Sequence, residues 1–233
     1  MITQYSKPED IDREFWADHK KAIYWLQKVG NTRDKRMKIL DDGWEVFNFR
    51  QEYSFSEPFY YTSPQTGNQW MMWITAKHDK QGDMHFYMRA VLFFYTEAYM
   101  TMMLGMKMAE EDGDGNVLNV ANSVNIYTSH MFQRMADKDR LGVDMSDRVK
   151  VMRNFVEFIT SGWSDTRPPR EGERHTQVAF RMPASWLRGH TVKVGSRYIN
   201  TYRTFYTDRS MTYRQEKDVR SFKKFADAKM NKQ

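Results

Sequence analysis

The chain has 233 residues and contains no cysteine. Disulfide bonds, thiolate zinc sites, iron–sulfur clusters and cysteine nucleophiles are therefore excluded. It also lacks a long uncharged apolar run, because its most apolar stretch, residues 86–108, carries Arg89, Glu97 and Lys107. Charges of this kind cost about 3 kcal/mol each at the centre of a bilayer. Since no basic segment followed by an apolar one opens the chain, we expect no signal peptide, no membrane association and a cytoplasmic protein.

Several motifs with known chemistry are also missing. The sequence has no G-x-S-x-G elbow, no Walker loop and no G-x-G-x-x-G turn, which excludes serine hydrolases, P-loop proteins and Rossmann domains that depend on them. The acidic run at 110–116 has the D-x-D-x-N start of a calcium loop. It carries Val117 where that loop needs glycine and Ser123 where it needs a bidentate glutamate. We therefore predict no metal site and no cofactor.

The hydrophobic periodicity predicts an α+β protein. The first half, residues 1–127, is expected to combine helices with an antiparallel sheet. The second half, 128–233, is expected to hold two helices, a small antiparallel sheet and a C-terminal helix, and the two halves either fold separately or share one core. Helical patterns cover 8–29, 33–40, 129–138, the stretch from about 146 to Gly162, and 216–230. Strand patterns cover 44–55, 69–77, 84–95, 117–127, 176–182, 189–194 and 198–206, while 100–109 fits a strand or the tail of a helix and 161–174 reads as a polar loop.

Charge is distributed unevenly between these halves. Residues 1–127 hold 14 Lys and Arg against 18 Asp and Glu, whereas residues 128–233 hold 22 against 12, and 14 of those 22 are arginine. Arginine presents a fixed fork of donors that matches phosphate oxygens and also stacks on bases. The second half therefore has the charge pattern of a nucleic-acid-binding surface, with a plain basic surface or an acidic protein partner as alternatives.

His130 and Arg134 are the first candidates for chemistry in the basic half. They lie four residues apart at the start of a predicted helix and so share one face. The outward N–H groups of a helix start favour an anion. A histidine there can transfer protons near neutral pH, and an arginine beside it can stabilise the charge of a phosphoryl transition state. The alternative is an ordinary helix start with a surface arginine.

The segment 129–135 reads SHMFQRM and is followed by Arg140, Gly142-Val143 and Ser146-Asp147-Arg148-Val149. This pattern resembles the helical opening of small bacterial toxin-like families, the barnase-type and related ribonuclease toxins, in which helices pack on a small antiparallel sheet. Their sheet tends to end in a strand with an apolar-Thr-apolar core, to which 202–206 (YRTFY) is similar. The resemblance covers about 128–213, leaves 1–127 unmatched, and implies a metal-independent ribonuclease with His130, Arg134 and Thr204 in its site.

Two neighbouring predicted strands add further candidates. Arg188 and His190 on one, and Tyr202 and Arg203 on the other, could face the same groove. We place His190 in the catalytic site with His130, Arg134 and Thr204. His130 and His190 would transfer protons, and Arg134 and Arg188 would contact the phosphate. Contacts to nucleic acid are predicted for Arg140, Arg188, Arg197, Tyr202 and Arg203.

Three functions remain open from the sequence. The first is a toxin-like ribonuclease that cleaves RNA without a metal and that a protein partner or inhibitor could neutralise. The second is a protein that uses the same arginine-rich half to bind nucleic acid, RNA above DNA, without cleaving it. The third is an interaction protein of a phage or mobile element whose aromatic N-terminal sheet serves as a docking surface.

Overall fold

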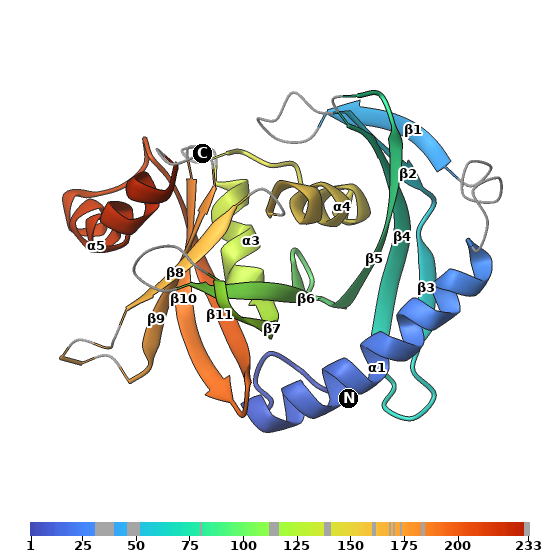
Figure 1. Cartoon of the computed structure of the whole chain (residues 1–233), viewed down its shortest axis with the longest axis horizontal. Helices are drawn as coiled ribbons and strands as arrows, with labels where there is room; N and C mark the ends of the chain where they lie inside the picture. Colours follow the sequence, from blue (N-terminus) through green and yellow to red (C-terminus); the bar gives the residue numbers. More distant parts are fainter. Residues whose placement is uncertain are drawn as a thin grey trace.

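The computed structural model describes residues 1–30, 40–45, 52–79, 81–111, 117–137, 141–159, 162–167, 169, 171–172, 174–182 and 185–230. These residues form one eleven-stranded sheet with helices on both of its faces (Figure 1). The α+β class expected from the sequence is confirmed. The helices are α1 (Pro8–Val29), α3 (Ser129–Ala136), α4 (Arg148–Ile159) and α5 (Tyr213–Met230). The strands are β1 (Leu40–Glu45), β2 (Glu52–Ser56), β3 (Phe59–Thr62), β4 (Gln69–His78), β5 (Met84–Tyr95), β6 (Met100–Glu111), β7 (Val117–Tyr127), β8 (Trp163–Arg167), β9 (Thr176–Met182), β10 (Ser185–Val194) and β11 (Arg197–Thr207).

The sheet runs without a break through both halves of the chain. Its strand order is β1-β2-β4-β5-β6-β7-β11-β10-β9-β8, with β3 paired beside β2 on the edge of β4. Neighbouring strands are antiparallel except β7 and β11, which pair in parallel from Ser123–Tyr198 to Tyr127–Tyr202. The strands of 128–233 thus continue the N-terminal sheet, and the expectation of a separate small sheet is corrected.

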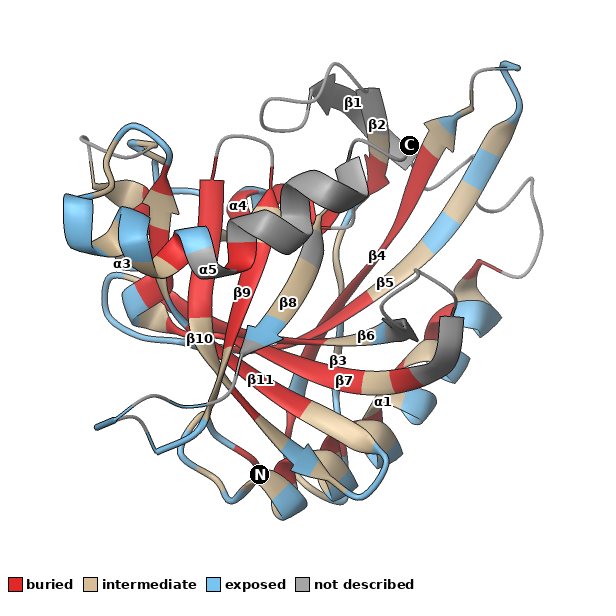
Figure 2. Cartoon of the chain, turned by 60° about the vertical axis from the view of Figure 1, so that its left-hand side comes forward, coloured by how far each residue is buried: buried red, intermediate tan, exposed pale blue. Residues whose placement is uncertain are grey.

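Each face of the sheet carries its own core. On β4, Met71 and Trp73 pack with the helices α3 and α4, whereas Trp70, Met72 and Ile74 pack with α1 on the opposite face. A smaller cluster lies under α5. Figure 2 shows the buried residues concentrated along the central strands and on the helix sides turned toward them. Because β4 is covered on both faces, its buried residues 70–76 are all apolar except Thr75 instead of alternating with polar ones.

Helix α1 packs closely on the middle of the sheet. It begins with Pro8 at a position that needs no N–H donor and ends before Gly30. Gly105 of β6 leaves room for it, since an added Cβ there would lie 2.8 Å from the ring of Trp16. The buried carboxylate of Asp18 accepts hydrogen bonds from Ser63, Thr66 and Asn68, the last at 2.7 Å, which ties α1 to the turn between β3 and β4.

Most elements predicted from periodicity are present, with several differences. The short strand β3 was not predicted, and β10 begins at Ser185, four residues before the predicted strand. The ambiguous stretch 100–109 belongs to a strand, β6. The single strand expected over 44–55 is two strands, because β1 ends at Glu45 and β2 begins at Glu52. The helix expected over 33–40 falls mainly outside the described residues. The loop expected over 161–174 contains an edge strand, β8, whose polar sequence carries no alternation signal; backbone pairing with β9 forms it.

None of the helices in the described part of the chain combines the length and apolar character that crossing a membrane requires.

His19 lies on α1 within a cluster of aromatic rings. Its ring stacks on Phe15 with 5.6 Å between centroids and meets the edges of Trp16 and Trp70 at 5.5 and 5.6 Å. Burial lowers the pKa of His19 to about 4, because these rings replace the water that would solvate an imidazolium.

We expect the substitution His19→Phe to make the protein less sensitive to acid. In the unfolded chain His19 takes up a proton near pH 6.5, but in the folded chain only near pH 4, so its contribution to stability falls as the pH drops between these values. From pH 7 to pH 5 this loss is about 2 kcal/mol, at about 1.4 kcal/mol per unit of pKa shift. Urea unfolding of the wild type and of His19→Phe at pH 7 and at pH 5 measures this loss of stability. The exposed His130→Phe serves as control, and an equal pH dependence in wild type and His19→Phe would contradict the linkage.

Candidate functional site

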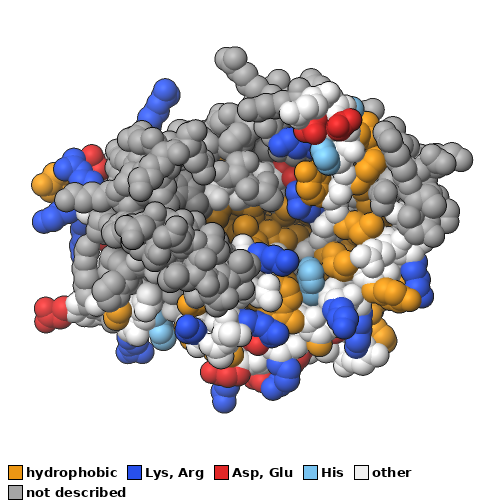
Figure 3. All heavy atoms as spheres, in the orientation of Figure 1, with side chains coloured by type: hydrophobic (Ala, Val, Ile, Leu, Met, Phe, Trp, Pro, Cys, Tyr) orange, Lys and Arg blue, Asp and Glu red, His pale blue; other side chains and the backbone are white. Residues whose placement is uncertain are grey.

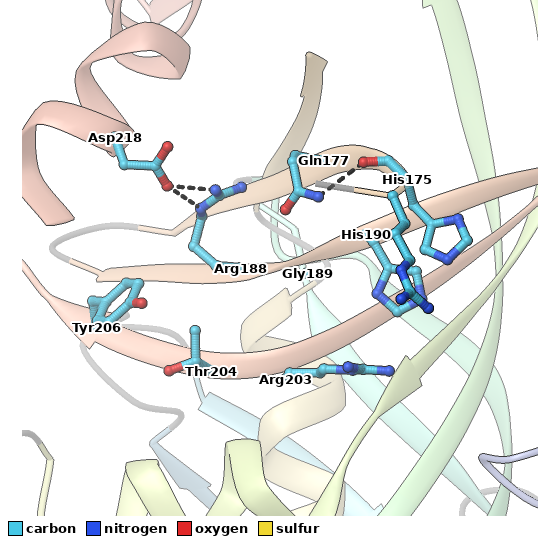
Figure 4. A pocket seen from close by; sticks show the side chains of 10 residues that line it. His175, Gln177, Arg188, Gly189, His190, Arg203, Thr204, Tyr206 and Asp218 are labelled. Carbon is cyan, nitrogen blue, oxygen red and sulfur yellow. Dashed lines mark hydrogen bonds and ion pairs between the residues drawn. The ribbon is translucent and has the colours of Figure 1, made fainter. Parts of the chain in front are cut away.

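A pocket of about 570 Å³ opens on the face of the sheet that carries α5 (Figure 4). Strands β10 and β11 form its floor, the segment leading into β9 forms one side, and α5 contributes to the other. Three arginines, two histidines and one aspartate are among its lining residues, which are Arg174, His175, Gln177, Arg188, Gly189, His190, Arg203, Thr204, Tyr206 and Asp218. The pocket is called the β9–β11 pocket below.

A β-bulge in the floor shapes this pocket. Arg188 pairs with Thr204, but the next residue, Gly189, pairs with Tyr202, so Arg203 is an extra residue on β11. A bulge of this kind places two consecutive side chains on one face of a sheet. Arg203 and Thr204 consequently both line the pocket, while Tyr202 before them is buried in the core on the other face.

Gly189 is the residue that makes the bulge possible. An added Cβ at this position would lie 1.8 Å from the carbonyl oxygen of Thr201 and 2.9 Å from the Cα of Tyr202. Both obstacles are backbone atoms, which no side-chain rotation can move. The sequence Arg188-Gly189-His190 therefore combines two side chains that line the pocket with the one residue type that fits between them.

The two histidines of the pocket lie against each other. The rings of His175, just before β9, and His190, on β10, stack with 5.2 Å between centroids and 27° between planes. Burial lowers the pKa of His190 to about 4, and the charges of Arg203 and His175 contribute to this lowering. At neutral pH the His190 ring is therefore uncharged and can accept a proton.

The cations of the pocket fall into two groups. Arg188 is buried, and its Nε and Nη2 both donate to Oδ2 of Asp218, the first at 3.1 Å, while Nη1 donates to the carbonyl of Val178 at 3.2 Å. Its guanidinium also lies 4.7 Å from the ring centre of Phe222. Arg174 and Arg203, in contrast, are exposed and have no carboxylate partner among the described residues. The histidine end of the pocket thus carries the positive charge available to a ligand.

Elsewhere in the basic half, several arginines are engaged in ion pairs and are not isolated cations. They include Arg134, Arg181, Arg197 and Arg220. On the face shown in Figure 3, the Lys and Arg side chains of the described residues lie scattered among acidic and neutral ones and form no continuous patch. The concentration of cations in the pocket is a local feature that net charge does not reveal.

The structure brings four of the predicted site residues into this pocket: Arg188, His190, Arg203 and Thr204. His130 and Arg134 are not among its lining residues. They lie on α3, where Nδ1 of the exposed His130 is 3.3 Å from Oε1 of Gln133 and Arg134 pairs with Asp137. The structure therefore separates the helical motif from the strand residues that the sequence placed with it.

The other three residues predicted to contact nucleic acid are not among the described residues that line the pocket. The placement of Tyr202 in the groove is wrong, because its side chain is 1% exposed and stacks on Tyr127 at 5.3 Å in the core. Arg197 lies at the β10–β11 turn, where it pairs with Asp12 of α1 at 3.1 Å and is not part of the pocket. Arg140 lies outside the described residues.

Sequence reasoning missed several lining residues, notably Arg174, His175, Tyr206 and Asp218. One signal could have found His175. The strands expected over 176–182 and 189–194 pair through a short connection, which places Gln177 opposite His190 and brings the residues just before β9 close to that ring. Asp218 had no such signal, since the docking of α5 on the sheet is a tertiary contact.

No protein-family model, curated protein or solved structure matches the chain. The resemblance of 128–213 to toxin-like ribonucleases stays a prediction, and the functional assignment depends on the chemistry of the pocket. Within the described residues, no group of three or more histidine, aspartate or glutamate side chains is arranged to hold a metal ion.

We expect Gly189→Ala to destabilise the protein by about 1–3 kcal/mol, the range for overpacking a close contact. The Cβ would force the bulged backbone of β11 away. Deleting Arg203 removes the extra residue and restores regular pairing, so the alanine should be tolerated better in the deletion background. Denaturant unfolding of the two single variants and the double variant measures this coupling. Additive effects would contradict the role given to Gly189.

We expect Arg203→Gln to raise the pKa of His190. The guanidinium disfavours a second positive charge beside it, but burial is the larger cause of the shift, so the pKa should remain below 6.5. An NMR titration of the His190 ring protons measures the change. Arg209→Gln is the control, because Arg209 lies in the exposed turn after β11 and outside the pocket, and it should leave the titration of His190 unchanged. An unchanged titration in Arg203→Gln would contradict the prediction and place the Arg203 guanidinium far from the His190 ring.

Proposed function

We propose that the protein is a ribonuclease that cleaves RNA without a metal ion and that the β9–β11 pocket is its active site. The observation that carries this proposal is the stacked pair His175–His190 beside two arginines that have no carboxylate partner among the described residues. Two imidazoles are enough to move both protons of the reaction, and the arginines attract the phosphate on which it occurs.

The chemistry is a transfer within the substrate itself. The neutral ring of His190 takes the proton of a ribose 2′-hydroxyl, and the 2′-oxygen attacks the adjacent phosphorus. The bond from phosphorus to the 5′-oxygen of the next nucleotide breaks, and that oxygen takes a proton from His175. The products are a 2′,3′-cyclic phosphate end and a free 5′-hydroxyl end.

Arg203 and Arg174 have the task of stabilising the charge that accumulates on the non-bridging oxygens during this step. Donors fixed in place before the reaction are worth more than mobile water, because they need no reorganisation as charge develops. The proposal retains His190, Arg203 and Thr204 from the sequence and assigns the second proton transfer to His175 instead of His130.

RNA binding without cleavage is the second candidate. Its support is that Arg174 and Arg203 are exposed cations at one end of a pocket, which suffices to bind a phosphate. The two candidates predict different products, so one experiment separates them.

We expect the purified protein to shorten an end-labelled RNA oligonucleotide in the presence of EDTA and to leave DNA of the same sequence intact, since DNA lacks the 2′-hydroxyl. His190→Ala should slow cleavage by about 10²–10⁴-fold, the usual contribution of a general base, while RNA binding is retained. His130→Ala is the control and should cleave at the wild-type rate, because His130 does not line the pocket.

Native and denaturing gels of the same reactions read out binding and cleavage. A shifted but intact RNA band would rule out cleavage and leave the binding function. An RNA that is neither shifted nor shortened would contradict both candidates. Loss of cleavage in His130→Ala would return the active site to α3.

A further inference from the structure

The β9–β11 pocket is larger than a phosphate requires. Its volume of about 570 Å³ lies within the range of about 300–1,000 Å³ that is typical of sites for whole small molecules. A phosphate bound beside Arg203 and His190 fills only a part of it. The remaining space extends along β11 toward α5 (Figure 4).

That remaining space differs in charge from the histidine end. Figure 4 shows Tyr206, Arg188 and Asp218 on one side of the pocket and His175, His190 and Arg203 on the other. The charge of Arg188 is balanced there by Asp218. Because this ion pair carries no net charge, the α5 end gives a second phosphate no net attraction and suits a neutral group better.

The α5 end also carries an aromatic ring and a hydroxyl group that can contact a planar ring. Tyr206 supplies an aromatic side chain, which packs against the cluster of Ala179, Trp186, Val219 and Phe222 under α5. Thr204 adds a hydroxyl group between Tyr206 and Arg203 on the same strand. Every nucleobase has a face that stacks on such a ring.

We propose that Tyr206, Thr204 and Asp218 bind the nucleobase of the nucleotide whose phosphate lies between Arg203 and His190. This inference rests on the proposed function for the position of the phosphate. The carboxylate of Asp218 selects bases that carry an amino group, because it accepts hydrogen bonds from such groups. It disfavours uracil, whose N3–H lies between two carbonyl oxygens that a carboxylate repels.

Isothermal titration with five ligands at low salt tests this subsite: inorganic phosphate, ribose 5-phosphate, CMP, AMP and UMP. We expect CMP and AMP to bind at least tenfold more tightly than ribose 5-phosphate and more tightly than UMP. Tyr206→Leu should remove this advantage, whereas Tyr206→Phe should keep it. Ribose 5-phosphate should bind all of these variants equally, which also shows that they are folded.

Tyr213→Leu is the matched control, because Tyr213 is 79% exposed at the start of α5 and lies outside the pocket. It should bind all five ligands like the wild type. Equal affinity for ribose 5-phosphate and the three nucleotides would overturn the base subsite while leaving the phosphate site intact. If none of the five ligands binds, inorganic phosphate included, the phosphate site is overturned as well. If UMP binds as tightly as CMP, the role of Asp218 is overturned.

Discussion

The parallel pairing of β7 with β11 connects the sheet strands of residues 1–127 with those of 128–233, and the positions of the other strands and of the pocket depend on it. Parallel neighbours cannot be joined by a tight turn, so the chain forms α3, α4 and β8–β10 between them. Asn200 donates to Asn125 across the pair at 2.8 Å inside the core. Such a buried polar contact is satisfied in one register, in which Tyr202 lies opposite Tyr127.

The placement of Tyr202 determines where the next side chains of β11 lie. With Tyr202 held in the core, the bulged Arg203 lines the pocket on the opposite face beside His190. Burial is the larger cause that lowers the pKa of His190 and keeps its ring neutral, and the guanidinium of Arg203 beside it adds to this lowering. The same local irregularity therefore places an exposed cation in the pocket beside a group that can accept a proton.

Strand periodicity locates the pocket's floor only in part. It places Arg188, His190, Arg203 and Thr204 on two adjacent strands, and these residues do line one pocket. The prediction for Tyr202 is wrong because strict alternation puts residues 202 and 204 on the same face, whereas the bulge at Arg203 puts them on opposite faces. The helical pair His130 and Arg134 shows a different limit: a local motif specifies that two side chains share a helix face, not what that face meets.

The sequence by itself determined the α+β class, the extent of α1 and of β4, β5, β7, β9 and β11, and the excess of arginine in the second half. These depend on local periodicity and composition. Only the tertiary structure decided that both halves build one sheet, that Gly189 and Arg203 form a bulge, and that α5 brings Asp218 to Arg188. Each of these joins residues distant in the chain. Such contacts depend on register and on how helices dock, which neighbouring residues in the sequence do not encode.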